Sequence, residues 1–167
     1  MTENAAATAT DESPSFDSLR PELDALVARY PERRAAMLPA LWVLQRERGW
    51  LSPQSIREIA DYLETPQAHV EGVITFYTMF KDREVGQDVV MVCKTLSCRL
   101  RGAGEVLDAV REKLGVDAHG DTSDGRYSIE PAECLGLCDM APCMLVGRER
   151  YGNLTPESAV RVLEERS

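Results

Sequence analysis

The stretch that decides the fold is VVMVCKTLSCRL at residues 89–100, together with ECLGLCDMAPCMLV at 133–146. Residues 89–92 form a continuous apolar run, which is typical of a buried strand. Cys93 follows this strand directly, and Cys98 comes just before a helix that we expect to begin near Arg99. The first two cysteines therefore bracket a predicted strand-to-helix loop.

Outward from the cysteines, the pattern predicts a small α/β layer. A turn signal at Asp124-Gly125 precedes a predicted strand at 126–129, and residues 144–146 form another short apolar run. Residues 147–152 are expected to turn between two edge strands, and Thr155-Pro156 to open a last helix that ends near Glu165. The order of elements predicts a thioredoxin-type α/β domain over residues 86–167. Its long helix, ended by Gly115, is marked by Leu100, Ala103, Val106, Leu107, Val110 and Leu114.

The part of the chain before residue 86 has a helical pattern. Residues 18–85 are predicted to form a helical bundle, because apolar residues recur there at helical spacing. Ser52-Pro53 and Thr65-Pro66 each place a capping hydroxyl before a proline suited to the first helical position, which predicts helices over about 53–63 and 66–75. Residues 1–17 contain acidic residues and no Lys or Arg, and we expect them to form a disordered tail.

The composition excludes several classes of function. The formal net charge of −9 argues against nucleic acid or an anionic membrane as the main partner, since both require clustered Lys and Arg. No apolar run is long enough for a membrane span, and the N-terminus lacks the pattern of a secretory signal. We therefore expect a reducing compartment, where spaced cysteine pairs hold metal or do redox chemistry more often than they form disulfides.

The five cysteines fall into two pairs and one further residue. Cys93-x4-Cys98 and Cys134-x3-Cys138 together supply the four thiolates that a [2Fe–2S] cluster needs. A structural zinc site has similar spacing, and unliganded core cysteines are the simplest alternative. A dithiol redox motif of the C-x-x-C type is absent. Spacing alone favours iron–sulfur and leaves zinc open.

The remaining candidate metal ligands are assigned other roles. Cys143 opens the apolar run at 143–146 and is predicted to be a small buried hydrophobic residue, the alternative being that it substitutes for one of the four ligands. His69 and His119 are the two histidines, and a Rieske-type cluster would need two of them beside two cysteines. Both are predicted to be solvated surface residues.

The sequence around the cysteines resembles a known family. Cys93-Lys-Thr-Leu-Ser-Cys98 and Glu133-Cys134-Leu-Gly-Leu-Cys138-Asp-Met-Ala-Pro142 are similar to the thioredoxin-like [2Fe–2S] subunit of NADH:quinone oxidoreductase (respiratory complex I). The similarity extends to Tyr30-Pro-Glu32, to residues 44–45 and 49–52, to Thr75-Phe-Tyr-Thr-Met-Phe80, to Thr122-Ser-Asp-Gly125 and to Asn153-Leu-Thr-Pro156. Related subunits occur in NAD-reducing hydrogenases and NAD-linked formate dehydrogenases.

The resemblance implies a specific set of ligands and partners. It implies one [2Fe–2S] cluster held by Cys93, Cys98, Cys134 and Cys138, and no catalytic residue on this chain. It also implies an electron-transfer role toward the flavin of a partner subunit that binds FMN and NADH. The location implied is cytoplasmic and peripheral to the membrane through the complex, without direct membrane insertion. A second function, a zinc-stabilised adaptor without electron transfer, shares the cysteine spacing, and a third places the cluster beside the main electron route.

Two further features bear on the partner. Residues 102–104 lack the context of a dinucleotide fingerprint, so the NAD and FMN sites are expected on another subunit. Phe76, Tyr77 and Phe80 form an aromatic group for which core packing is the simpler interpretation, the alternative being a contact surface for the flavin-bearing partner. Trp42 and Trp50 are predicted to lie in the core.

Overall fold

The computed structural model describes residues 14–166. The chain divides into two compact units, the first ending at Glu84 and the second beginning at Val85. The acidic tail predicted for residues 1–17 lies outside the described residues up to residue 13, and its last two residues belong to the first helix. In the part described, no helix is both long and apolar enough to cross a membrane.

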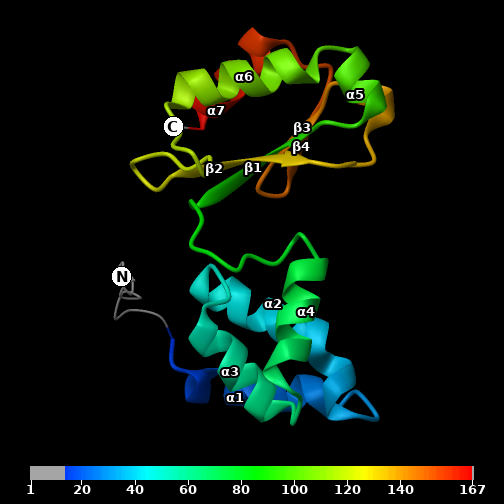
Figure 1. Cartoon of the computed structure of the whole chain (residues 1–167), viewed down its shortest axis with the longest axis vertical. Helices are drawn as coiled ribbons and strands as arrows, with labels where there is room; N and C mark the ends of the chain where they lie inside the picture. The colour runs from blue at the N-terminus through cyan, green and yellow to red at the C-terminus, as the bar shows by residue number, and fades with distance from the viewer. Residues whose placement is uncertain (1–13, 167) are drawn as a thin grey trace, which may run out of the picture. The chain divides into compact units, whose positions relative to one another are not determined.

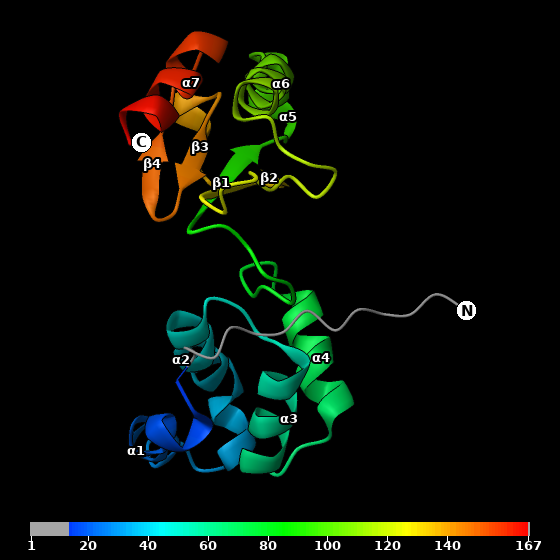
Figure 2. The same cartoon turned by 90° about the vertical axis from the view of Figure 1, so that its left-hand side faces the viewer.

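The first unit is a bundle of helices (Figures 1 and 2). Its core contains side chains from every helix, the most completely buried being Leu23, Leu41, Leu44, Leu51, Ile59, Leu63 and Val70. Each such side chain contributes about 1.5–3 kcal/mol through its removal from water. The elements are α1 (Phe16–Val27), the short 3₁₀ helix η1 (Arg33–Ala36), α2 (Met37–Arg48), α3 (Pro53–Tyr62) and α4 (Gln67–Phe76).

The two predicted helix starts in this unit differ in outcome. The Ser52 hydroxyl accepts a hydrogen bond from the Ser55 backbone N–H and caps α3, as predicted. The predicted Thr65 cap is wrong. The backbone of Pro66 is extended, so α4 starts at Gln67, and the Thr65 hydroxyl instead donates to the Leu63 carbonyl. The helix start therefore lacks a side-chain cap.

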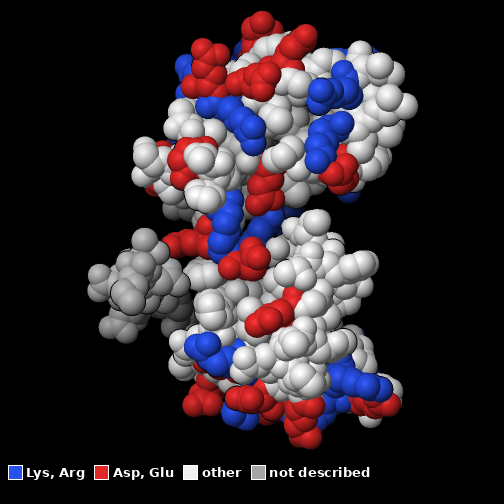
Figure 3. All heavy atoms as spheres, in the orientation of Figure 1, with Lys and Arg blue, Asp and Glu red and all other residues white. Residues whose placement is uncertain are grey.

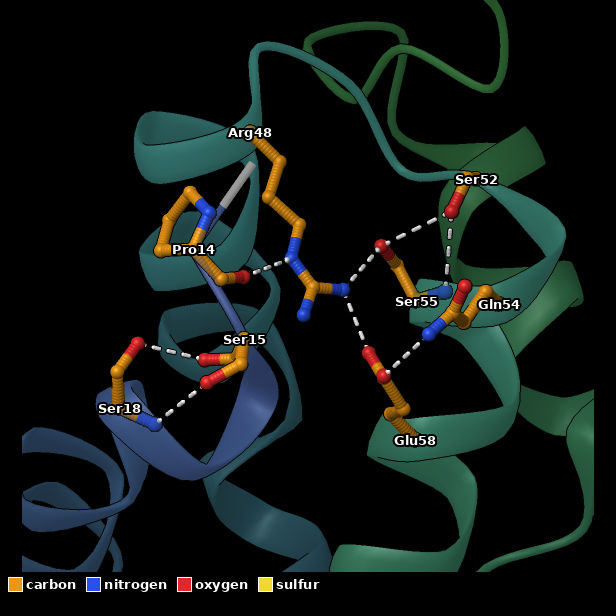
Figure 4. Close-up of polar contacts among 8 residues, drawn as sticks. All are labelled: Pro14, Ser15, Ser18, Arg48, Ser52, Gln54, Ser55 and Glu58. Atoms are coloured by element: carbon orange, nitrogen blue, oxygen red, sulfur yellow. Dashed lines mark hydrogen bonds and ion pairs between the residues drawn. The ribbon is translucent and has the colours of Figure 1, made fainter. Parts of the chain in front are cut away.

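One arginine ties three segments of the first unit together (Figure 4). The Arg48 guanidinium donates to the Pro14 carbonyl at 3.2 Å, to the Ser55 hydroxyl at 2.9 Å and to the Glu58 carboxylate at 2.5 Å. The Arg48 side chain is 10% exposed and the Glu58 side chain 21% exposed. This ion pair is thus largely shielded from water and links the end of α2 to α3 and to the residues that precede α1.

The second unit is a two-layer α/β structure built on one four-stranded sheet. The strands are β1 (Asp88–Cys93), β2 (Tyr127–Ala132), β3 (Met144–Val146) and β4 (Glu149–Tyr151), and their order in the sheet is β2-β1-β3-β4. Strand β1 pairs parallel with β2 and antiparallel with β3, and β3 pairs antiparallel with β4. The prediction of two edge strands around residues 147–152 is half wrong, because β4 is at the edge whereas β3 lies inside.

Two helices cover one face of this sheet (Figures 1 and 2). They are α6 (Ala103–Leu114) and α7 (Pro156–Glu165), and the Thr155 side chain caps α7 as predicted. Their inward faces meet the sheet in a core that includes Val90, Val92, Ile129, Met144, Val106, Val110, Ala159 and Leu163. The layer order therefore agrees with the predicted α/β class.

The helix predicted to follow Cys98 is in fact two helices. A short helix, α5 (Leu96–Leu100), precedes α6, and Gly102 separates them with φ of +91°, a left-handed conformation that glycine adopts readily. Cys98 therefore lies within α5 rather than before a helix. The break lets the chain redirect between the cysteine loop and the long helix that packs on the sheet.

Candidate metal centre

The sheet brings the two predicted cysteine pairs to the same edge. Cys93 is the last residue of β1, and Cys98 lies in the helix that follows it. Cys134 follows the end of β2, and Cys138 begins the short 3₁₀ helix η2 (Cys138–Met140). Because β1 and β2 are parallel neighbours, their carboxyl ends lie together, with Cys93 opposite Ala132. Both pairs thus start from adjacent strand ends.

Three sulfur atoms gather at this edge, and one of them was not predicted as a ligand. The Sγ atoms of Cys93, Cys98 and Cys143 all lie within 4.8 Å of one another. Cys98 Sγ and Cys143 Sγ are 3.7 Å apart, and all three side chains are buried. Cys134 and Cys138 are exposed and do not belong to this group. The structure thus joins the first pair to Cys143 and leaves the second pair at the surface.

The two cysteine-bearing loops contact each other through main-chain and side-chain groups. The Cys93 thiol donates to the Glu133 carbonyl at 3.1 Å, and the Lys94 N–H donates to the Ala132 carbonyl at 2.9 Å. The Lys94 ammonium forms a 2.8 Å ion pair with Glu133. The residue after Cys93 is therefore held against the residue before Cys134, so the loops are positioned by contacts that need no metal.

Backbone amides approach the sulfur atoms from the second loop. The Gly136 N–H donates to Cys134 Sγ at 3.4 Å, and Gly136 has φ of +71°. The Leu135 N–H donates to the Cys93 sulfur. Such N–H groups stabilise negative charge on thiolates and on the cluster they hold. Gly136, which lies between Cys134 and Cys138, thus lets a backbone amide come close to a cysteine sulfur.

The three buried thiols differ in acidity. Burial would raise the pKa of Cys93, but hydrogen bonds from the Thr95 hydroxyl, 3.1 Å away, and from the Thr95 and Leu135 amides lower it to about 7. Burial, reinforced by Cys93, raises the pKa of Cys98. Burial and the neighbouring Cys98 raise the pKa of Cys143 to about 12. Cys93 is thus the thiol most readily converted to the thiolate that a metal requires.

The residues present fit an iron–sulfur cluster. Four thiolates can be supplied from two adjoining loops, sulfur-directed N–H groups are in place, and apolar Leu135 and Leu137 pack against the buried cysteines. Among residues 14–166, the Cys93, Cys98 and Cys143 sulfurs form the one set of three or more potential metal ligands within such a distance. The donor set is all sulfur, which suits iron–sulfur chemistry and zinc alike.

The family model for thioredoxin-like [2Fe-2S] ferredoxins matches residues 23–167. The chain belongs to the thioredoxin-like [2Fe–2S] ferredoxin family. The match covers both compact units apart from the first helical residues, so the helical bundle is part of what the family model describes. Membership agrees with the resemblance found in the sequence and with the expected combination of a helical N-terminal region and an α/β domain.

Curated relatives of this ferredoxin-family chain are components of one kind of complex. An NADH-quinone oxidoreductase subunit of Mycobacterium tuberculosis is 40% identical over 147 residues, which are 87% of this chain and 58% of that protein. The corresponding NADH-quinone oxidoreductase subunit of Escherichia coli K12 is 37% identical over 135 residues, 81% of each chain. The chain thus spans about 58% of the length of the mycobacterial relatives that it matches.

A solved structure shares the fold of this ferredoxin-family chain at low sequence identity. An NAD+-reducing [NiFe]-hydrogenase in the H2-reduced state matches with a TM-score of 0.64 and 19% identity, over 76% of this chain and 22% of that chain. At this identity the likeness concerns the fold alone.

Several side chains of the chain differ in exposure or position from what the sequence predicted. Trp42 is 41% exposed, so the prediction that it lies in the core is wrong, and Trp50 is half-buried. Phe80 is buried, whereas Phe76 is 78% exposed, so the aromatic group is divided between core and surface. His69 and His119 are exposed, as predicted. No local signal in the sequence placed Cys143 beside Cys98, from which it is 45 residues away.

Proposed function

We propose that this chain is an electron-transfer subunit that carries one [2Fe–2S] cluster on Cys93, Cys98, Cys134 and Cys138. The observation that carries the proposal is the parallel pairing of β1 with β2, which starts both cysteine loops from one edge of the sheet. When bound, such a cluster takes up and releases a single electron. The role in NADH:quinone oxidoreductase is inferred from the relatives that are named as subunits of that complex.

The chain's own residues would orient the thiolates and set the charge around them. Thr95 and Leu135 direct hydrogen-bond donors at Cys93, and Gly136 directs one at Cys134. Donors of this kind favour the more negative state of a cluster and so raise its reduction potential. The Lys94–Glu133 ion pair joins the two loops at their bases. These contacts position Cys93 and Cys134 and the two loops that follow β1 and β2.

The partner would cover apolar surface that is now exposed beside the cysteines. Leu96 and Leu100 flank Cys98 in α5 and are 73% and 78% exposed. Exposed apolar side chains that adjoin on one helix face mark surfaces where a second protein binds, and once covered they would keep water away from the site of electron exchange. The partner proposed is the subunit that binds FMN and NADH, because this chain exchanges electrons and has no dinucleotide fingerprint.

The helical unit offers a second apolar surface. The face over α4 carries few charged side chains (Figure 3), and the exposed aromatic and methionine side chains there include Phe76, Tyr77 and Met79. Phe76 and Tyr77 help to line a shallow hollow of about 270 Å³, together with Ala68, His69, Gly72 and Val73. We propose that this surface docks a subunit of the same complex and keeps the chain peripheral to the membrane on the cytoplasmic side.

The cluster is tested by metal analysis of anaerobically purified full-length protein. We expect about two irons and two acid-labile sulfides per chain, with an EPR signal that appears after reduction. The Cys134→Ala and Cys138→Ala variants should each lose the cluster. One zinc and no iron in the wild-type protein would contradict the proposal and would favour the zinc-stabilised adaptor.

The partner is tested with variants of the two apolar surfaces. Leu100→Asp should weaken binding to the flavin-containing subunit, and Phe76→Asp binding to the subunit that docks on α4, each by about tenfold or more, because each change places a carboxylate in a covered apolar contact. Arg57→Asp, on the exposed face of α3, serves as the matched control. Unchanged affinity for both apolar variants would contradict the docking surfaces. Mass spectrometry of the captured complex separates a quinone oxidoreductase from an NAD-linked hydrogenase or formate dehydrogenase.

A further inference from the structure

The fifth cysteine lies inside the candidate metal centre. Cys143 precedes β3, its carbonyl accepts a hydrogen bond from the Cys93 N–H at 3.1 Å, and its side chain is 1% exposed. The antiparallel pairing of β1 with β3 therefore sets Cys143 beside the last residue of β1. An ordinary apolar side chain would satisfy packing here, but the thiol points at another thiol.

The distance between Cys98 and Cys143 suits shared access to one metal ion. A metal–thiolate bond is about 2.3 Å long, so two thiolates on a tetrahedral ion are about 3.8 Å apart. Cys98 Sγ and Cys143 Sγ are separated by 3.7 Å, and both lie within 4.8 Å of Cys93 Sγ. A tetrahedral ion placed between these two sulfurs would therefore be within bonding distance of both without movement of the backbone.

We propose that Cys143 is a reserve ligand of the cluster, able to take the position of Cys98. This inference rests on the proposed function, in which Cys98 is one of the four primary ligands. The exchange breaks the iron–sulfur bond to Cys98 and forms one to Cys143, while the proton of the Cys143 thiol passes to the released Cys98 thiolate. No oxidation state changes, so no further reactant is required.

Cys143 is placed to replace Cys98, which belongs to the first cysteine pair, and not a ligand of the second pair. All five cysteines of the chain are accounted for, and Cys143 is the one outside the two pairs. Cys134 and Cys138 are exposed and lie outside the group of three sulfurs. Loss of Cys98 would therefore be compensated by a thiol already in place, whereas the group of three sulfurs found among the described residues includes neither Cys134 nor Cys138.

The test compares alanine variants of the full chain, since alanine supplies no ligand atom. Cys98→Ala should retain about two irons per chain and give an EPR signal with altered g values, because a different thiolate then binds the iron. Cys98→Ala/Cys143→Ala should lose the iron. Cys134→Ala is the matched control, in which Cys143 is intact and the iron should be lost. Cys143→Ala alone should keep two irons, since Cys98 then serves.

The outcomes distinguish failure of the reserve-ligand proposal from failure of the proposed function. Absence of iron in the wild type overturns the proposed function, whereas iron in the wild type but none in a folded Cys98→Ala chain overturns the reserve ligand alone. If circular dichroism shows that Cys98→Ala is unfolded, the near-isosteric Cys98→Ser replaces it. A Cys98→Ser cluster that survives the additional Cys143→Ala change is bound through serine and refutes the role of Cys143, and one that is lost supports it.

Discussion

The Arg48–Glu58 ion pair gives the sharpest prediction about the stability of the helical unit. Arg48→Met keeps the aliphatic stem, and it removes the charge together with the hydrogen bonds to Pro14, Ser55 and Glu58. Glu58 would then retain one partner, the Gln54 amide at 2.9 Å. The change leaves a carboxylate in a site that excludes most water.

The magnitude follows from burial. Removal of one partner costs about 3–5 kcal/mol for a fully buried ion pair and about 0–1 kcal/mol for an exposed one. The Arg48 and Glu58 side chains are 10% and 21% exposed, so this pair lies near the buried end of that range. The remaining exposure of Glu58 and its bond to Gln54 reduce the loss. We expect the free energy of unfolding of this unit to fall by about 2–3 kcal/mol.

The assay is urea unfolding of the full chain followed by tryptophan fluorescence. Trp42 and Trp50 are the two tryptophans of the chain, and both lie in the helical unit, so the signal reports that unit alone. A loss of this size should lower the urea midpoint by about 1–2 M for an m value typical of small domains. The slope of the transition should stay unchanged.

Arg46→Met is the matched control, because it removes ion pairs of similar length that are exposed to water. Arg46 forms ion pairs of 2.8 and 2.7 Å with Glu22 and Glu47, but its side chain is 53% exposed. Arg46→Met should therefore shift the midpoint far less than Arg48→Met, although the distances are similar. Equal shifts in the two variants would refute the reasoning. Arg48→Met/Glu58→Leu should recover part of the lost stability, because it leaves no unpaired charge.

Three further predictions concern the second unit. Thr95→Val removes a hydroxyl 3.1 Å from Cys93 Sγ, and it should raise the pKa of that thiol and lower the cluster's reduction potential by about 40 mV in an EPR redox titration. An unchanged potential would contradict this. Backbone amides of the 119–121 turn hold the pKa of Asp117 below its ordinary value. The resulting stability is present above about pH 3.9 and is lost as pH falls through the lower folded pKa, so Asp117→Asn should flatten the acid limb of unfolding curves measured by circular dichroism. A limb as steep as that of the wild type would argue against it. Gly86→Ala places a methyl group 2.6 Å from the β2 backbone and should destabilise this unit by about 1–3 kcal/mol, measured as faster amide exchange in β1. In the control variant Gly104→Ala, on α6, the added methyl group meets nothing within 4 Å, so amide exchange in β1 should not change.

Local chemistry was sufficient for much of the fold. Ser52 and Thr155 cap their helices because each hydroxyl lies within reach of an N–H three residues away, a contact fixed by the adjacent chain. Thr65 precedes a proline in the same way, yet Pro66 is extended and the helix begins one residue later. Gly102 likewise divides a continuous apolar pattern into two helices through a left-handed backbone. The sequence pattern predicts where helices occur, whereas the backbone conformation of single residues decides where they begin and end.

In the candidate site, too, local sequence spacing predicted some features and missed those that depend on distant segments. The two cysteine pairs were predicted from spacing, since only four and three residues separate the members of each pair. Cys143 was assigned to packing because its contact with Cys98 spans 45 residues and arises from the β1–β3 pairing, which no local pattern encodes. The exposed Trp42 was missed for a related reason, because an aromatic residue in an apolar helical stripe does not show which side of the stripe faces outward.

The parallel pairing of β1 with β2 also bears on how the protein matures. The chain between these strands forms α5 and α6 and returns across the sheet before Cys93 pairs with Ala132, two residues ahead of Cys134. Crossovers of this kind join distant segments and are among the slower steps of folding. The edge that carries the candidate ligands therefore forms only when this long-range pairing closes, so its assembly depends on the fold of the whole second unit.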